Sequence, residues 1–442
     1  MKKLQIYFLL YILLNLHLLR NISFKSYIFV LSLIYFPILV YCFSNIWIIE
    51  IKWIAVWYSL FFLSGLWAAM STFLGYGSPA AAYATGRYFM TMPMVIIAYL
   101  FITTPKDVKK TLMLFCVIVM LGAATIPMQY IVGPISWFSE PGERAAITRY
   151  ASLLGSLTTA GSMIPIAIFV SLVLRIRRLF KSILIAGLSL GAILSLQKAA
   201  LLGIPLAVGL HLLFIKKMRI KKIVFGGVFV IALIGILNLS LKNWPVWKQA
   251  SGYMLAAFKL NKDPEALGGD VSIFKSIIDR ITLLPRNSLR DLKEYRGELG
   301  YLLGGGFGMV GPALMRPDDS PYITAHNGYV DFILIGGVIH LVAFLGLIYA
   351  TIIPYRRMIK QCNRAGLKDE IPVCCYGILI IVLISLFFGG GFTFQPIAST
   401  LLWSLVGISW RLENRQMDMV EGEEISPFHF YSESALKSND IS

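Results

Sequence analysis

Residues 328–352 read GYVDFILIGGVIHLVAFLGLIYATI, and Asp331 and His340 are the only acidic or basic side chains in this stretch. A helix crosses a bilayer with about 20 mainly apolar residues, so this stretch predicts a transmembrane helix. The same pattern continues outward along the chain, of which 57% is hydrophobic and only 14% charged. Soluble domains are about 25% charged. The composition therefore excludes a disordered chain and indicates a polytopic membrane protein.

The apolar runs predict an all-α polytopic fold with about 12 transmembrane helices. The first run follows Lys2 and Lys3 and is similar to a signal peptide, but no small-residue cleavage site follows it, so we expect an uncleaved first span. The expected spans are 4–19, 26–48, 53–74, 88–104, 111–133, 155–174, 180–196, 199–215, 223–240, 328–352, 371–388 and 393–410.

The net charge of +17 follows the predicted topology. With a cytoplasmic N-terminus, the inside loops hold 20 lysine and arginine residues and the short outside loops hold 6. This asymmetry is the positive-inside rule, and it predicts that both termini are cytoplasmic. It also removes the main argument for nucleic-acid binding. The five cysteines form no CxxC pair, so we expect no metal cluster, no disulfide framework and no cofactor.

The chain divides into four predicted regions. Residues 1–240 hold spans 1–9, residues 241–327 form a long periplasmic loop with amphipathic helices, residues 328–410 hold spans 10–12, and residues 411–442 form a disordered cytoplasmic tail. Residues 241–325 contain 11 basic and 9 acidic side chains and are the only extramembrane part large enough to do chemistry. Within them, 271–284 has one apolar helical face, which favours a helix along the outer membrane boundary; a helix packed inside the loop is the alternative.

His326 and Asn327 stand directly before the span at 328–352. Asn327 is suited to cap that helix. The positive end of the helix dipole disfavours a protonated imidazole, and a neutral His326 can act as a general base. Asp331 lies one turn into the helix at membrane depth, where a carboxylate needs a partner such as His326 or an arginine. Taken alone, His326 is also compatible with an ordinary boundary histidine.

Basic residues of the outside loops form a second candidate constellation, namely Arg144, Arg149, Lys198 and Arg280. Each alone reads equally well as a lipid-headgroup anchor. Together they suggest an anion site on the outer face, where a lipid-linked pyrophosphate would meet them. The glycines of GGGFG at 304–308 do not match a nucleotide-binding loop and predict a tight turn at the membrane surface.

The run HNGYVDFILIGG at 326–337, preceded by GGGFG, resembles the O-antigen ligase/polymerase family of bacterial envelope glycosyltransferases. RYASLLG at 149–155 and LSLQKAALLG at 194–203 resemble two further outside motifs of that family. The resemblance implies a GT-C-like architecture and a metal-independent, inverting transfer of a glycan from undecaprenyl pyrophosphate to a sugar hydroxyl. It assigns activation of the hydroxyl to His326 and pyrophosphate binding to Arg280 and Lys198, with Arg149 assisting. Lys198 departs from the family, which usually has arginine there.

The resemblance leaves several functions open. The leading hypothesis is a polymerase that joins lipid-linked repeat units of O-antigen, capsule or exopolysaccharide in the bacterial inner membrane, with its active site on the periplasmic face. The alternatives are a ligase that moves the finished glycan to lipid A core or protein, a flippase of lipid-linked sugars, and a structural membrane scaffold. The expected partners are the lipid-linked oligosaccharide, an acceptor glycan, membrane lipid, a chain-length regulator and a flippase, but no nucleic acid.

Overall fold

The computed structural model describes residues 52–75, 88–102, 104–135, 142–144, 147–155, 157–216, 278–310, 325–364, 370–387 and 396–421, with scattered positions at 36–44, 85–86 and 218. The predicted spans 4–19 and 223–240, most of 26–48, and Asp318 and Asp319 lie outside these residues. The fold is mostly helical, as the sequence predicts. The only strands in the described part are β1 (Gly142–Arg144) and β2 (Ile147–Arg149), an antiparallel pair in which Gly142 faces Arg149.

Most helices lie over the predicted apolar runs, but α7 begins at residue 105 rather than 111 and α16 continues to residue 364 rather than 352. The helices are α4 (Trp53–Gly75), α6 (Met94–Phe101), α7 (Pro105–Val132), α8 (Leu157–Val173), α9 (Arg178–Leu194), α10 (Lys198–Phe214), α14 (Leu283–Arg296), α15 (Leu299–Leu303), α16 (Gly328–Arg364), α17 (Glu370–Leu386) and α18 (Pro396–Glu421), with a 3-10 turn at η3 (Phe307–Met309). Of these, α4, α7 and α16 are long and apolar enough to cross a membrane. Helix α18 continues beyond residue 410, where the sequence predicts the start of a disordered tail.

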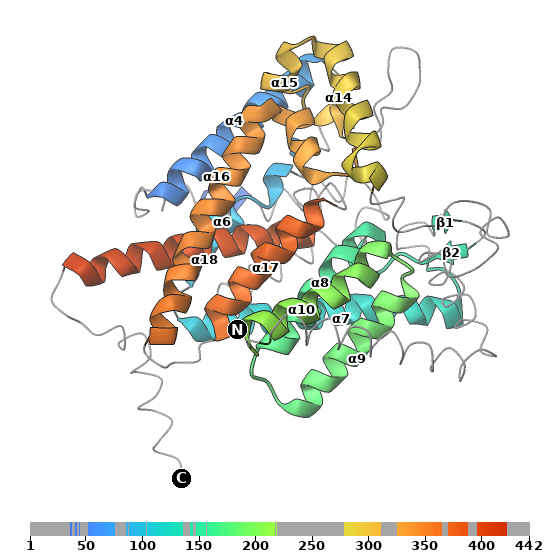
Figure 1. Ribbon diagram of the computed structural model, residues 1–442, viewed down its shortest axis with the longest axis vertical. Coiled ribbons are helices and arrows are strands. Elements are labelled where there is room, and N and C mark those ends of the chain that lie inside the picture. The colour runs from blue at the N-terminus through green and yellow to red at the C-terminus, as the bar shows by residue number, and fades with distance from the viewer. Residues whose placement is uncertain are drawn as a thin grey trace.

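Two groups of helices meet at α17 (Figure 1). Helices α4, α6, α16 and α18 pack together on one side, and α7, α8, α9 and α10 on the other, while α17 contacts both α16 and α8. Small residues allow close approach between these helices, which is the usual packing solution in membranes. A Cβ atom at Gly203 of α10 would overlap with Pro165 of α8, and one at Gly407 of α18 would overlap with the Val95 carbonyl of α6.

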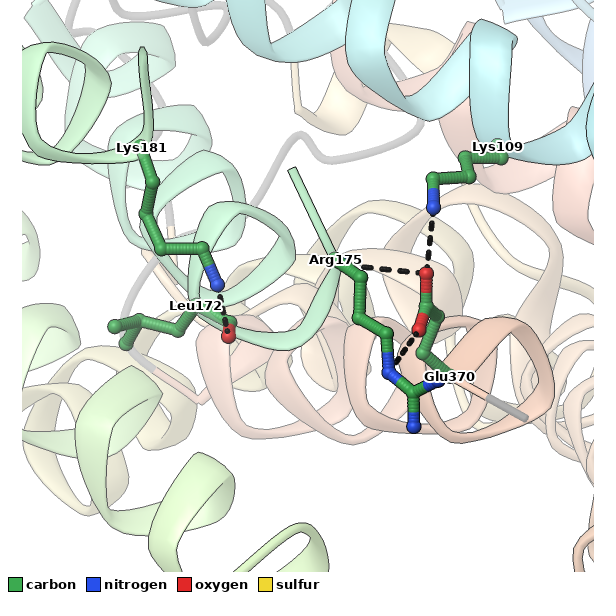
Figure 2. Close-up of polar contacts among 5 residues, drawn as sticks. All are labelled: Lys109, Leu172, Arg175, Lys181 and Glu370. Atoms are coloured by element: carbon green, nitrogen blue, oxygen red, sulfur yellow. Dashed lines mark hydrogen bonds and ion pairs between the residues drawn. The ribbon is translucent and has the colours of Figure 1, made fainter. Parts of the chain in front are cut away.

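Several helix ends that the predicted topology assigns to the cytoplasmic side lie close to one another. Glu370 at the start of α17 accepts a hydrogen bond from Lys109 Nζ at 2.7 Å and pairs with Arg175 Nε at 3.2 Å; these three residues are the Glu370 cluster (Figure 2). Lys181 at the start of α9 donates to the Leu172 carbonyl at the end of α8 (3.0 Å). These contacts join the ends of α7, α8, α9 and α17 on one side of the bundle.

Helix ends that the predicted topology assigns to the periplasmic side also contact one another in pairs. Tyr130 near the end of α7 donates to the Leu194 carbonyl at the end of α9 (3.1 Å). Tyr329 at the start of α16 donates to the Leu383 carbonyl near the end of α17 (2.7 Å). The candidate residues of the outer face are thus carried by neighbouring helix ends.

Candidate functional site

Asn327 caps the first turn of α16. Its Oδ1 accepts hydrogen bonds from the backbone N–H groups of Tyr329 (3.1 Å) and Val330 (3.4 Å), and its carbonyl accepts from Asp331 N at 2.9 Å. These bonds satisfy N–H groups that have no partner inside the helix. Because the side chain is held by both bonds, Asn327 fixes the point at which the chain enters α16.

Asn327 also joins α16 to the long loop. Its Nδ2 donates to the backbone carbonyl of Arg280 at 3.2 Å, although the two residues are 47 positions apart. Arg280 lies in a short helical stretch, 278–281, directly before α14. One amide side chain thus holds the predicted pyrophosphate-binding arginine beside the predicted base.

His326 sits between these two elements in an unusual conformation. Its φ angle of 48° is in the left-handed region, which is uncommon for residues other than glycine. The imidazole is exposed on one side, yet shielding by the surrounding protein lowers its pKa below 6.5, and the nearby positive charge of Arg280 lowers this pKa further. The imidazole is therefore neutral near pH 7, as a general base requires.

Asp331 is the buried acidic group of this site. Only 7% of the residue is exposed, and its Oδ1 has no hydrogen-bond partner in the described part of the chain. The described residues also give it no ion pair, so the expected pairing with His326 or an arginine is not seen there. A buried carboxylate oxygen without a partner is costly, which makes Asp331 a candidate for contact with a bound hydroxyl group.

Helix α16 is broken one turn below Asp331. Gly336 and Gly337 leave the helical conformation, with φ and ψ of −131° and 19°, then 75° and −172°. The break separates a half-helix, Gly328–Ile335, from the long remainder of α16. Leu334 and Ile335 lose their normal donors, and their carbonyls instead accept hydrogen bonds from Gly305 N (2.8 Å) and Gly306 N (2.9 Å).

The GGGFG segment therefore has a different role from the one the sequence suggested. We expected a tight turn at the membrane surface, but Gly304–Gly306 lie against the helix break, and all three glycines are buried. Side chains would not fit in this contact, since a Cβ at Gly304 or Gly337 would overlap with backbone atoms across it. The segment supplies the backbone donors that a broken membrane helix needs.

Helix α4 anchors the same segment from the other side. Thr72 Oγ1 accepts a hydrogen bond from Phe307 N at 2.7 Å. Trp67 Nε1 donates to the Leu303 carbonyl at 3.0 Å, and Arg296 Nη2 donates to Ser71 Oγ at 2.8 Å. The half-helix thus contacts a segment that is hydrogen-bonded to α4 through Arg296, Leu303 and Phe307.

His340 lies just below the break and is fully buried. Its Nδ1 is 2.6 Å from Ser64 Oγ and its Nε2 is 2.7 Å from Tyr88 OH. The ring also stacks on Phe61, with centroids 4.5 Å apart. Both ring nitrogens are engaged, so His340 joins α4, residue 88 and α16 as a structural residue.

Arg149 and Lys198 are carried by the other helix group. Arg149 ends strand β2, and Tyr150 after it packs edge-on against Tyr130 of α7 (4.7 Å between centroids). Because Tyr130 also bonds the Leu194 carbonyl, the 149–155 loop and the turn before Lys198 share one support. Lys198 is the first residue of α10, and its side chain, like that of Arg144, lies outside the described residues.

Of the predicted site residues, the structure brings together Arg280, His326, Asn327 and Asp331. It places Arg149 and the backbone of Lys198 at neighbouring helix ends. The part of the chain that the structure describes has no cluster of three or more histidine, cysteine, aspartate or glutamate side chains that could hold a metal ion.

No known family model matches this chain, and no curated protein matches it in sequence.

Proposed function

We propose that the chain is a membrane glycosyltransferase that moves an undecaprenyl-pyrophosphate-linked glycan onto a sugar hydroxyl, and that it polymerises repeat units of a surface polysaccharide. The observation that carries the proposal is the tether between Asn327 and Arg280, which holds a cation beside the neutral imidazole of His326. A base next to an arginine is the pair of groups that displacement of a pyrophosphate requires.

In the proposed reaction, His326 takes the proton of the acceptor hydroxyl as its oxygen attacks the anomeric carbon of the donor. The bond from that carbon to the pyrophosphate oxygen breaks on the opposite face, which inverts the anomeric centre. The electron pair leaves on the pyrophosphate, where Arg280 stabilises the added negative charge, with Lys198 and Arg149 as further cations. Asp331 accepts a hydrogen bond from the acceptor sugar.

The experiment is reconstitution of the purified protein in liposomes with an undecaprenyl-pyrophosphate-linked repeat unit. We expect His326→Ala and His326→Gln to lower transfer by about 10²–10⁴-fold, the usual contribution of a general base. Donor binding should persist in both variants. Normal transfer by His326→Gln would remove the histidine from the mechanism.

The role of Arg280 in donor binding is tested against a control substitution at another arginine of the same region. Arg280→Gln should weaken use of the donor, and Arg280→Lys should restore it only in part, because lysine keeps the charge without the bidentate fork. Arg286 is exposed on the first turns of α14 and serves as the control. Equal donor kinetics for Arg280→Gln and Arg286→Gln would contradict the assignment. A chelator should leave transfer unchanged.

The same reconstitution separates the polymerase from the ligase. A polymerase forms products of several repeat units from the donor alone, whereas a ligase needs an added lipid A core or protein acceptor. Polymer formed without any other acceptor supports the leading proposal. Product formed only with such an acceptor supports the ligase.

A further inference from the structure

A crevice lies at the end of the bundle that carries the Glu370 cluster. It is lined by the C-terminal end of α6, by the N-terminal ends of α7 and α17, and by residues of α16 and α18. Its wall is mainly apolar, with Thr104 and Tyr355 as polar members and Arg411 as the cation. The apolar lining includes Ile102, Val108, Met358 and Ile408. Helix ends from both groups of helices therefore form one apolar slot with a guanidinium beside it.

Arg411 is the unusual member of this wall. The residue is half-buried on α18, and its Nε is fully buried with no hydrogen-bond partner among the described residues. Its guanidinium carbon lies 5.2 Å from the ring centroid of Tyr99, an aromatic face that holds the cation without neutralising it. Within the same residues Arg411 forms no ion pair, so no described carboxylate neutralises its charge.

Three acidic groups lie near this crevice, and several basic residues surround them. Glu370 binds Lys109 and Arg175, and Asp107 accepts from Thr104 in the capping box that starts α7. Glu413 lies two residues after Arg411 on α18, where Arg357 and Lys52 are close enough to act on it electrostatically. Cations therefore exceed carboxylates at this end of the bundle, which favours an anionic occupant.

We propose that this crevice binds an anionic glycerophospholipid, with the phosphate on Arg411 and part of an acyl chain in the apolar slot. Charge complementarity selects an anion, and the apolar wall selects an anion that carries hydrocarbon. Basic pockets between helices at the inner face of a membrane are a known setting for such headgroups. The proposal is independent of the proposed glycan transfer, and it concerns the opposite end of the bundle.

Native mass spectrometry of the purified full chain in detergent tests the proposal with three probes. These are phosphatidylglycerol, phosphatidylethanolamine and inorganic phosphate. We expect phosphatidylglycerol to bind about tenfold more tightly than phosphatidylethanolamine, and Arg411→Gln to remove most of that preference. Arg411→Lys should retain part of it. Arg356→Gln, at an exposed arginine of α16, should leave the preference unchanged.

A second variant tests the apolar slot without changing charge. Met358 is half-buried on the crevice wall, so Met358→Phe should fill the slot and lower phosphatidylglycerol binding while the protein stays folded. Equal affinity for the two lipids in the unmodified chain would overturn the proposal. So would an unchanged preference in Arg411→Gln, or full displacement of phosphatidylglycerol by inorganic phosphate, which would identify a plain phosphate site.

Discussion

The contact between the GGGFG segment and the broken helix makes Gly337→Ala a severe perturbation. Gly337 has φ 75° and ψ −172°, a conformation that residues with a Cβ occupy at a cost of about 1–3 kcal/mol. The new methyl group would also overlap with the Leu302 carbonyl, which belongs to backbone and cannot turn away as a side chain would. Segment 302–306 must therefore move away from α16.

That movement breaks the two hydrogen bonds from Gly305 and Gly306 to the carbonyls of the break. Each is worth about 0.5–1.5 kcal/mol net. Alanine in place of glycine recovers about 0.4–1 kcal/mol through the unfolded chain. The expected net loss is about 1–6 kcal/mol, concentrated at this contact.

Hydrogen exchange of residues 300–310 in detergent measures this loss directly. A loss of 2 kcal/mol speeds exchange of the Gly305 and Gly306 amides by about 30-fold, since 1.4 kcal/mol is a factor of ten. Gly187→Ala is the matched control, because a Cβ there meets Met120 at an ordinary 3.5 Å within helix α9. Equal protection of residues 304–306 in Gly337→Ala and the unmodified protein would refute the assignment of the break.

Three further predictions concern single side chains. Asn327→Asp keeps an acceptor for the cap but loses the donor to Arg280, so it should lower transfer with little change in thermal stability, whereas Asn327→Ala should also lose about 1 kcal/mol of stability. Arg280→Gln removes a positive charge that lowers the pKa of His326, so that pKa should rise and the acid limb of the pH–rate profile should move to higher pH; an unmoved limb would mean that His326 is not the titrating base. Glu370→Gln leaves the two cations of the Glu370 cluster without their carboxylate and should lower the free energy of unfolding by about 1–3 kcal/mol. The loss is measured as a lower melting temperature in detergent. Glu294→Gln is the control, because its ion pair with Arg290 is exposed.

The helical fold could be predicted because the apolar runs are long and contain few charged residues, and because basic residues gather in every second loop. Helix α7 carries a boundary signal that the predicted span, 111–133, did not use. Thr104, Pro105 and Asp107 form a capping box with proline at the first helical position, and these residue types are readable in the sequence. Asn327 before α16 is another local signal of this kind, and there the structure shows the cap that the sequence predicts.

The helix break could not be predicted from periodicity. An apolar run that contains two adjacent glycines keeps the composition of one continuous span, and the deciding contacts come from residues 302–306, some thirty positions earlier. Glycine pairs in both segments were the available signal, but sequence alone does not say that they face each other. The His340 partners Ser64 and Tyr88 were missed for the same reason, since both come from distant helices.

The break in α16 bears on the choice between an enzyme and a transporter. Transporters place discontinuous helices at their substrate or ion sites, where the freed carbonyls and helix ends bind the cargo. Here the freed carbonyls of Leu334 and Ile335 are occupied by the chain's own N–H groups, and the nearby imidazole of His340 has both nitrogens engaged. The carbonyls at the break and the two nitrogens of His340 are therefore bonded within the described part of the chain. By contrast, Asp331 Oδ1 on the half-helix has no hydrogen-bond partner among the described residues. A break whose carbonyls are bonded within the chain favours the proposed catalytic site over a transport site that must open to both sides.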